Sequence, residues 1–359
     1  MKKILLIDYY GMCDKDGRAI GHSPKVLEEY GALLRDEFEV SAAVSPCLLK
    51  DIKGEFREKY ELKYDICIEN GTSVGKRIID KLKLFYNISN VIKIDGYDIY
   101  WFYKTDFFLF FFFCFINKNK ENRKKLIAQI YQESFGSGKV QGILNWLYQK
   151  GMLKFDGMIY SQKEMASKHP NTLYFPDYYY DSEKYKKYEL LEKEEKVVCL
   201  GTMNPYKKLE ELVDAFMRNG YPLEIRGYFF DKDFYQSLCN KINPDVTPNI
   251  LIEDRLLTEN EYYETLAGAR YAILPYDMEQ YQCRTSGVLI ESMFLNTIAI
   301  APIQLLEENQ FDGIGYKRID ELANPAFFEK EFTVDNREKK KEFDKGEIGK
   351  RLRKFINNI

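Results

Sequence analysis

Residues 270–302, RYAILPYDMEQYQCRTSGVLIESMFLNTIAIAP, indicate the fold of this chain more clearly than any other segment. An apolar run (270–276) leads into a polar loop, and apolar residues then recur at helical spacing over 286–296. A second apolar run (297–302) follows at once. A strand, a helix and another strand in this order predict two parallel strands joined by a helix.

The same alternation extends toward the N-terminus through the second half of the chain. Each repeat of strand, loop and helix predicts a further parallel strand with a helix packed on the sheet. The amphipathic helix that begins at Lys207 ends at Gly220, a residue type common at helix C-termini. We expect strands at 196–202, 222–228 and 249–254, and helices at 207–220, 230–242 and 258–269.

The first half follows the same pattern more loosely. It opens with the apolar run KKILLID (2–8) and a glycine-punctuated loop, after which Ser23-Pro24 offers an N-cap and a first-turn proline to a helix. We therefore predict an α/β protein with two Rossmann-like, doubly wound parallel-sheet domains. The expected parts are a first domain at 1–178, a linker at 179–195, a second domain at 196–335 and a C-terminal helix at 336–359.

Composition narrows the classes of function. The 53 basic and 56 acidic residues give a net charge of −3, which argues against a nucleic-acid binder. The seven cysteines include no CxxC pair, which argues against a zinc site or a disulfide framework and favours a reducing cytoplasm. With only His22 and His169, a histidine-based metal centre is disfavoured, and we expect neither a metal nor a cofactor.

The loop at 274–291 carries the strongest chemical signal, because ligands of such sheets bind on the loops after the strands. Thr285-Ser286-Gly287 opens a helix and offers N–H groups and hydroxyls to an anion such as a phosphate. Glu291 lies one turn further on the same side and can accept hydrogen bonds from a ribose diol. Lys207 or Lys208 can meet a diphosphate. Equally, these residues can serve only as helix caps and solvated charges.

The stretch from Val197 to Pro302 resembles the nucleotide-sugar half of a GT-B glycosyltransferase, most closely the retaining family 4 group. The shared pieces are a strand ending in Leu-Gly, a lysine after a short loop, a helix ending in DAF, a strand ending in Arg-Gly, a helix ending in LAGA, and then YAILPY, SGVLIES and TIAIAP. The resemblance implies two domains that face a cleft, with the C-terminal helix packing back on the first domain.

The resemblance assigns roles to single positions on the donor side. Lys207 stands where the family has a diphosphate-binding lysine, and Glu291 stands on the second glutamate of a pair that holds the ribose. The helix start would approach the diphosphate through its backbone N–H groups. The expected donor site comprises Thr202, Asn204, Lys207, Arg226, Arg255, Cys283, Ser286, Gly287, Val288 and Glu291.

The acceptor side is expected in the first domain. The resemblance implies that the loop from Gly11 to Ser23, which contains Gly21, closes over donor and acceptor. The histidine that often follows the middle strand of this domain in the family is missing. Glu133 is the polar group available there, and it joins His22 as a candidate catalytic residue.

Two donor-side positions depart from the family pattern. Cys283 replaces the first glutamate of the pair, and Thr202 replaces the usual arginine after Leu-Gly. Arg226 or Arg255 could supply the missing diphosphate charge. These departures put the donor sugar in doubt more than the nucleotide site.

The implied activity is transfer of a sugar from a UDP- or GDP-sugar to a glycan or lipid-linked acceptor, in bacterial surface polysaccharide synthesis. The reaction would retain the anomeric configuration and need no metal, because basic side chains and helix N-termini stabilise the leaving diphosphate. Two alternatives stay open. Because Cys283 and Thr202 depart from the pattern, the chain could be a non-catalytic nucleotide-sugar-binding partner subunit. A sugar-nucleotide epimerase of the same fold is the other alternative.

Two DxD strings, at 14–16 and 231–233, resemble metal-nucleotide motifs of another glycosyltransferase fold, but we expect them to be chance matches. The run FFLFFFFCFI (107–116) is too short to span a bilayer, and the basic segment KNKENRKK (118–125) adjoins it. Together they form either an interfacial membrane anchor or, the interpretation we favour, a buried helix followed by a solvated loop. We expect a cytoplasmic protein, with association at the inner membrane surface as an open alternative.

Overall fold

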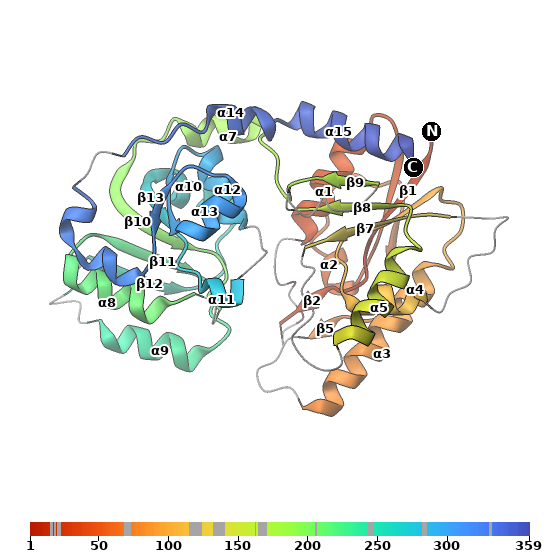
Figure 1. The fold of residues 1–359 in the computed structure, drawn as a ribbon, viewed down its shortest axis with the longest axis horizontal. Helices are drawn as coiled ribbons and strands as arrows, with labels where there is room; N and C mark the ends of the chain where they lie inside the picture. The colour runs from red at the N-terminus through yellow and green to blue at the C-terminus, as the bar shows by residue number, and fades with distance from the viewer. Residues whose placement is uncertain are drawn as a thin grey trace. The chain divides into compact units, whose positions relative to one another are not determined.

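The computed structural model divides into two compact units, shown in Figure 1. Unit 1 comprises Met1–Asp177 and Gly346–Ile359, and unit 2 comprises Tyr178–Lys345. The structure describes residues 1–14, 17, 19, 23–67, 73–114, 124–131, 141–161, 163, 171–204, 207–242, 247, 249–281, 286–329 and 332–359.

Unit 1 is built on a seven-stranded parallel sheet in the order β4-β3-β1-β6-β7-β8-β9. Its central strands are continuous apolar runs, because a parallel sheet covered on both faces buries both sides of each strand. The strand order reverses between β1 and β6, so the loops after these two strands diverge at the sheet's carboxyl edge. The strands are β1 (Lys3–Asp8), β3 (Glu39–Val44), β4 (Lys59–Glu61), β6 (Ile99–Phe102), β7 (Lys125–Ile130), β8 (Gly157–Tyr160) and β9 (Thr172–Tyr174).

Large aromatic side chains fill the interior of unit 1. Trp101 of β6 stacks on Tyr30 of α1 with ring centroids 5.1 Å apart, and both are fully buried. A two-stranded ladder pairs β2 (Met12–Cys13) with β5 (Ile66–Cys67). The helices are α1 (Ser23–Leu34), α2 (Pro46–Leu49), α3 (Val74–Val91), α4 (Phe107–Cys114), α5 (Gln141–Met152) and most of α15 (Lys345–Asn358).

Unit 2 contains a six-stranded parallel sheet in the order β12-β11-β10-β13-β14-β15. Its strand order reverses between β10 and β13. The strands are β10 (Glu194–Leu200), β11 (Leu223–Gly227), β12 (Ile250–Asp254), β13 (Ala269–Ile273), β14 (Ile298–Pro302) and β15 (Ile314–Tyr316).

The helices of unit 2 begin where polar side chains cap them. Asp231 accepts a hydrogen bond from the N–H group of Phe234 at the start of α9, and Thr258 forms a capping box with Glu261 in α10. The helices are α7 (Ser182–Glu189), α8 (Leu209–Asn219), α9 (Lys232–Lys241), α10 (Glu259–Gly268), α11 (Met278–Tyr281), α12 (Gly287–Phe294), α13 (Ile303–Asn309) and α14 (Arg337–Glu342), with 3₁₀ turns η2 (Ile319–Ala323) and η3 (Pro325–Phe327).

The two parallel-sheet α/β domains confirm the predicted fold class, with two local differences. The segment 179–195, expected as a linker, contains α7, because Asp181 caps this helix and its tyrosines Tyr185 and Tyr188 are buried. The C-terminal helix expected at 336–359 is two helices. The helical conformation is interrupted at Phe343, between α14 and α15. This residue is buried, and its carbonyl oxygen accepts a hydrogen bond from the N–H group of Tyr180.

The phenylalanine run forms helix α4 as far as Cys114, and the rest of the run lies outside the described residues. Leu109, Phe110 and Phe113 are buried, which confirms the interpretation of this helix as part of the core. Among the helices that the structure describes, none combines the length and hydropathy needed to cross a membrane.

Candidate functional site

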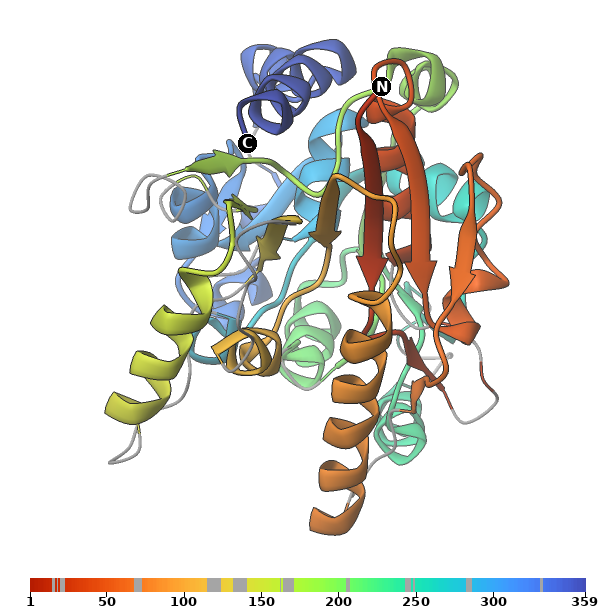
Figure 2. The ribbon, with the colours of Figure 1, turned by 90° about the vertical axis from the view of Figure 1, so that its right-hand side faces the viewer.

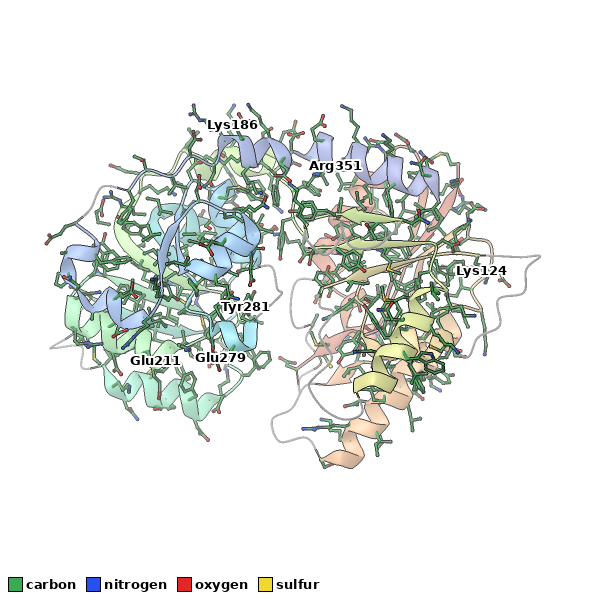
Figure 3. All side chains as sticks on the ribbon, in the orientation of Figure 1. Lys124, Lys186, Glu211, Glu279, Tyr281 and Arg351 are labelled. Atoms are coloured by element: carbon green, nitrogen blue, oxygen red, sulfur yellow. The ribbon has the colours of Figure 1, made fainter. Side chains whose placement is uncertain are left out.

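The predicted donor residues that the structure describes lie at the carboxyl edge of the second sheet, on strand ends and on the segments that follow them. The loop after β10 and the loop after β13 leave the sheet at the point where the strand order reverses. In open α/β sheets this is the place where ligands bind. The first loop precedes Lys207, and the second contains α11 and precedes α12. Figure 1 labels α11 and α12, and Figure 3 labels Glu279 and Tyr281 of α11.

Lys207 is a buried lysine, with 5% of its surface exposed. Its Nζ donates a hydrogen bond of 2.7 Å to the carbonyl oxygen of Leu200, the last residue of β10, and lies 3.7 Å from Sδ of Met203. Burial lowers the pKa of this lysine, because the charged form loses its water. Within the described part of the chain, no carboxylate forms an ion pair with this lysine. An anion that binds in the site would therefore stabilise the charged form of Lys207.

Glycines bring the loop after β10 close to neighbouring elements. Gly201 has a φ of +96°, and a Cβ atom there would lie 3.9 Å from both Nζ of Lys207 and Cγ2 of Val288. A Cβ atom on Gly227 of β11 would lie 1.7 Å from the carbonyl oxygen of Gly201. Nζ of Lys207 and the side chain of Val288, in the first turn of α12, therefore both lie close to Gly201.

The start of α12 is held by tyrosines. Ser286 is the N-cap, its Oγ accepts from the N–H group of Leu289 at 3.4 Å, and it lies 3.2 Å from the Tyr276 hydroxyl. The Tyr276 ring stacks on Tyr281 with centroids 3.9 Å apart. A Cβ atom on Gly287 would come within 2.8 Å of the Tyr178 ring, so a glycine fits best here. First-turn N–H groups lack partners within the helix and attract anions.

Glu291 lies one turn into α12 and is 4% exposed. Its Oε2 accepts a hydrogen bond of 2.7 Å from Tyr262, and its Oε1 accepts one of 2.8 Å from Tyr263. Burial and the charge of Glu291 raise the pKa of Tyr262, which keeps that hydroxyl a donor. This tyrosine pair was not among the predicted site residues, although two adjacent aromatic residues in a predicted helix were a visible signal. Each carboxylate oxygen can accept more than one hydrogen bond.

The remaining donor-side residues are tied to other partners. Arg226 pairs with Glu224 at 3.2 Å and with Glu253 at 3.5 Å, and Arg255 pairs with Glu261 at 2.9 Å. Both guanidinium groups are engaged with carboxylates, and their role toward a diphosphate stays a prediction. The carbonyl oxygen of Asn204 accepts from the N–H group of Lys207 at 3.0 Å, and Thr202 lies between them and β10.

Several predicted positions lie outside the described residues, namely Gly21, His22, Glu133 and Cys283. Gly11 and Ser23, which bound the predicted acceptor loop, are described. A Cβ atom on Gly11 would overlap Oγ of Ser45, so the backbone passes very close to that side chain. Ser23 is buried at the first position of α1.

The carboxyl edge of the first sheet holds a buried carboxyl group, Asp8, within the electrostatic influence of the half-buried Lys104, and neither was among the predicted site residues. Asp8 ends β1, and its Oδ1 accepts from the N–H group of Tyr10 at 3.0 Å, while its buried Oδ2 has no hydrogen-bond partner in the described chain. Burial raises the pKa of Asp8, partly offset by the charge of Lys104 after β6. Burial also lowers the pKa of Lys104, which faces Asp8 and Asp106. Such perturbed groups are typical of functional sites.

Asp177 follows β9 at the same edge and is 6% exposed. Burial raises its pKa to about 7, against a smaller lowering by a hydrogen bond from Tyr131. Burial, followed by the charge of Asp177, raises the pKa of Tyr30 and of Tyr103. Its buried Oδ1 has no hydrogen-bond partner among the described residues. A carboxyl group with such a pKa can both accept and donate a proton near neutral pH.

The DxD strings have structural roles where they are described. Asp231 caps α9, and the carbonyl oxygen of Asp14 closes a turn by accepting from the N–H group of Gly17 at 3.1 Å. In the described part of the chain, no three His, Cys, Asp or Glu side chains lie close enough together to hold a metal ion.

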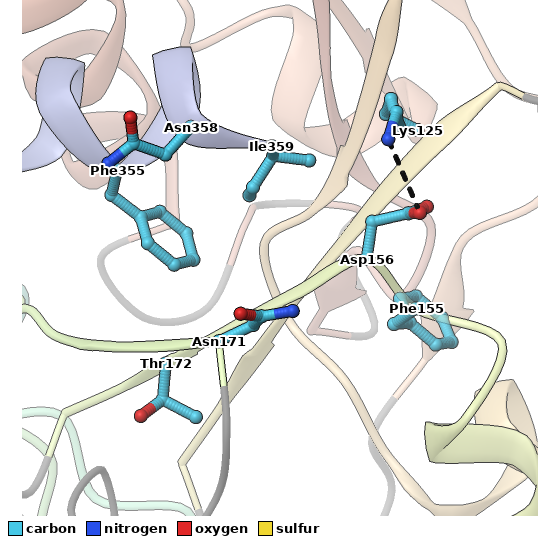
Figure 4. Close-up of a pocket in the computed structure, with 8 residues that line it drawn as sticks. All are labelled: Lys125, Phe155, Asp156, Asn171, Thr172, Phe355, Asn358 and Ile359. Carbon is cyan, nitrogen blue, oxygen red and sulfur yellow. Dashed lines mark ion pairs between the residues drawn. The ribbon is translucent and has the colours of Figure 1, made fainter.

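Two open cavities occur in the described part of the chain, and Lys208 and Tyr276 line one of them. One, of about 510 Å³, lies in unit 2 between α8, α11 and the segment after β15, and most of its lining residues are charged. The other, of about 600 Å³, lies in unit 1 where Lys125 and Asp156 are 3.8 Å apart, near Phe355 of α15 (Figure 4). Neither contains Lys207 or Glu291.

Comparison with protein-family models finds no matching family, and comparison with curated proteins finds no matching relative. Solved structures do match. HepE from Anabaena, in complex with UDP and glucose, gives a TM-score of 0.64 at 14% identity over 100% of both chains. AviGT4, a glycosyltransferase involved in Avilamycin A biosynthesis, gives 0.59 at 11% identity over 99% of this chain and 97% of that one.

A third match is the UDP-GlcNAc 2-epimerase from Methanocaldococcus jannaschii, with a TM-score of 0.56 at 10% identity over 100% of both chains. At such low identity these matches establish the shared two-domain fold, which is that of GT-B proteins.

Proposed function

We propose that this chain is a glycosyltransferase that moves a sugar from a UDP- or GDP-sugar to a glycan or lipid-linked acceptor. The reaction retains the anomeric configuration and uses no metal ion. We place it in bacterial surface polysaccharide synthesis, at the inner face of the membrane. The observation that carries the proposal is the buried ammonium of Lys207 beside Gly201 and the first turn of α12, at the switch point of the second sheet.

The diphosphate of the donor binds between Lys207 and the N–H groups of Gly287 and Val288. The helix N-terminus and the ammonium both stabilise negative charge, and that charge grows on the diphosphate as the bond to the sugar breaks. The same groups therefore bind the donor and favour its departure. The leaving phosphate takes the acceptor proton on the same face, so a dedicated general base is not required.

The ribose of the donor binds at Glu291. Tyr262 and Tyr263 fix the two carboxylate oxygens, and the diol adds hydrogen bonds to their remaining lone pairs. A carboxylate held in this way is already oriented before the donor arrives, which reduces the entropy lost on binding.

The acceptor binds at the carboxyl edge of the first sheet. Asp8 and Asp177 each have one buried oxygen without a hydrogen-bond partner in the described chain, and sugar hydroxyls are donors that suit them. The positive charge of Lys104 favours the ionised form of the Asp8 carboxyl group. His22 and Glu133 remain candidates on this side.

The test of the donor site is calorimetric titration with UDP, GDP, CMP and their sugars, on the intact chain and on two neighbouring lysine variants. Lys207→Met keeps the aliphatic volume and removes the buried charge, whereas Lys208→Met removes a charge that is 41% exposed and 3.8 Å from Asp277. We expect one nucleoside diphosphate to bind, with at least about a tenfold loss in Lys207→Met and little change in Lys208→Met. If no nucleotide binds, or both variants lose affinity equally, the donor site is wrong.

An epimerase of the same fold is the second candidate, because the match to a UDP-GlcNAc 2-epimerase covers both chains completely. Incubation of the nucleotide sugar that binds with candidate glycan or lipid-linked acceptors, followed by NMR of the products, separates the candidates. A free nucleoside diphosphate and a glycosylated acceptor indicate a transferase. A nucleotide sugar in which the configuration of one sugar carbon has been inverted indicates an epimerase. Binding without either product indicates a non-catalytic partner subunit.

A further inference from the structure

Helix α7 follows the boundary between the two units in sequence, and it is the light green helix at the top of Figures 1 and 2. It packs against α10, the helix that carries Tyr262 and Tyr263. Its Tyr185 is only 1% exposed, although the sequence predicted a linker in this segment. A tyrosine buried this deeply needs a hydrogen-bond partner for its hydroxyl group.

The partner of the Tyr185 hydroxyl is Tyr263. The two hydroxyl oxygens are 3.3 Å apart, and the rings meet edge to face with centroids 5.3 Å apart. Tyr263 has one hydroxyl proton, which it donates to Oε1 of Glu291 at 2.8 Å. Burial and the charge of Glu291 raise the pKa of Tyr263, so this proton is retained. Tyr185 is therefore the donor to Tyr263, and the three side chains form a series of hydrogen bonds that ends on the carboxylate.

Tyr185 also contacts the helix that carries the carboxylate. Its ring packs on Phe294 of α12, with centroids 5.2 Å apart. Phe294 lies three residues after Glu291 in the same helix. Tyr185 thus touches both α10, which supplies the hydrogen-bond donors, and α12, which supplies the acceptor.

We propose that Tyr185 is a positioning residue for Glu291 and that it controls recognition of one of the two ribose hydroxyls. Its hydroxyl orients Tyr263, which fixes Oε1 of the carboxylate. Tyr262 fixes Oε2 separately. Because each oxygen is held by its own donor, each presents its remaining lone pair to one hydroxyl of the diol. The proposal deepens the proposed function and rests on it, because it requires that Glu291 bind the ribose.

Helix α7 offers a matched control one turn later. Tyr188 is also buried, at 6% exposure, and its ring centroid lies 5.3 Å from that of Tyr263. Its hydroxyl instead donates to Oδ1 of Asn260 at 2.9 Å. Tyr185→Phe and Tyr188→Phe therefore remove the same group from the same helix, and only the first breaks the series that ends on Glu291.

The test is calorimetric titration of the full chain with UDP and GDP and with their 2′-deoxy and 3′-deoxy analogues. We expect Tyr185→Phe to weaken binding of the ribonucleotide about threefold to tenfold, the range for one hydrogen bond. The loss should persist with one analogue and disappear with the analogue that lacks the hydroxyl bound by Oε1. Tyr188→Phe should bind all three forms of the nucleotide as the wild type does. Equal losses with all three forms in Tyr185→Phe would overturn the proposal.

A double-variant comparison tests the series itself. Tyr263→Phe removes the donor to Oε1, so its loss of affinity should depend on the analogue in the same way. Adding Tyr185→Phe to Tyr263→Phe should then weaken binding no further, because the series is already broken. Losses that multiply in the double variant would show that the two hydroxyls act independently and would overturn the proposal.

The outcomes separate this inference from the donor site on which it rests. Thermal unfolding of Tyr185→Phe and Tyr188→Phe measures any loss of folding apart from the change in affinity. A wild-type chain that binds neither UDP nor GDP would overturn the proposed function and this inference together. A wild-type chain that binds one of them, with Tyr185→Phe indistinguishable from Tyr188→Phe, would overturn this inference alone.

Discussion

Single buried ionisable groups mark both candidate sites. Lys207 in unit 2 and Asp8 and Asp177 in unit 1 are each almost fully buried at the carboxyl edge of a sheet. Burial shifts the pKa of each group toward its neutral form. An isolated buried charge costs folding free energy, so its retention at a sheet edge indicates a use that outweighs that cost.

Asp177 should make the stability of the chain depend on pH. Its folded pKa of about 7 lies above the ordinary value of 3.8, so the folded state binds the proton more tightly than the unfolded state. The stabilising contribution is complete below about pH 4 and is lost as the pH rises to about 7, by up to roughly 4 kcal/mol. In urea unfolding across this range, Asp177→Asn should gain stability relative to the wild type as pH rises. A difference that is constant with pH would contradict the assignment.

Glu291 should be required for nucleotide affinity. Replacing it by glutamine removes the charge and one acceptor, so Glu291→Gln should weaken nucleoside diphosphate binding by about 1–3 kcal/mol in calorimetry. Tyr262→Phe should cost less, because Tyr263 still holds the carboxylate. Glu264→Gln, on the same helix as the tyrosines, is the control. Unchanged affinity in Glu291→Gln would remove this residue from the site.

At the scale of elements, the loop after β10 is shaped by the strand beside it. Gly227 ends β11 directly below the carbonyl group of Gly201, and Met203 of the same loop pairs with Phe229. A side chain at the end of β11 would push this loop away from the sheet. The position of Lys207 therefore depends on glycines in two neighbouring elements.

Gly227→Ala should destabilise unit 2 and also reduce nucleotide binding, because the Cβ atom would meet backbone rather than a movable side chain. We expect a loss of about 3 kcal/mol or more, as for other severe steric changes in a core. Gly268→Ala, at the end of α10, has open space around it and should be neutral or slightly stabilising. Thermal unfolding and calorimetry measure both effects, and equal melting temperatures for the two variants would refute the argument.

The sequence predicted the elements better than the contacts between them. Alternating strands and helices follow from local periodicity, so both sheets and the approximate positions of Lys207, Ser286 and Glu291 were predictable. The break between α14 and α15 was not, because it depends on a backbone contact between Phe343 and the distant Tyr180. The hydrogen bonds from Tyr262 and Tyr263 to Glu291 were not predictable either, nor was the buried Oδ1 of Asp177 without a partner in the described chain. Both features depend on tertiary packing, which local sequence patterns do not encode.

At the scale of the whole molecule, α15 completes unit 1 from the far end of the chain. Its Arg353 donates to the carbonyl oxygen of Leu33 at 2.8 Å and pairs with Glu37 at 3.0 Å. Ile348, Leu352 and Ile356 are fully buried. Unit 1 is therefore discontinuous in sequence, and unit 2 is one uninterrupted segment.

Leu352→Ala should lower the stability of unit 1 by about 2–5 kcal/mol, the usual cost of truncating a fully buried leucine. In scanning calorimetry one unfolding transition should shift down while the other stays in place. The exposed neighbour Lys354 provides the control variant Lys354→Ala, which should shift neither. A parallel shift of both transitions would show that the two units do not unfold separately.

The discontinuity of unit 1 also sets an order for folding during synthesis. The ribosome delivers residues 1–177 first, but the segment 346–359 that completes their domain emerges only after all of 178–345 has been made. Domains generally fold as units while the chain is being synthesised. Unit 2 is therefore complete first, although it is translated second. Until α15 emerges, the surface of the nascent first domain that it will cover stays exposed.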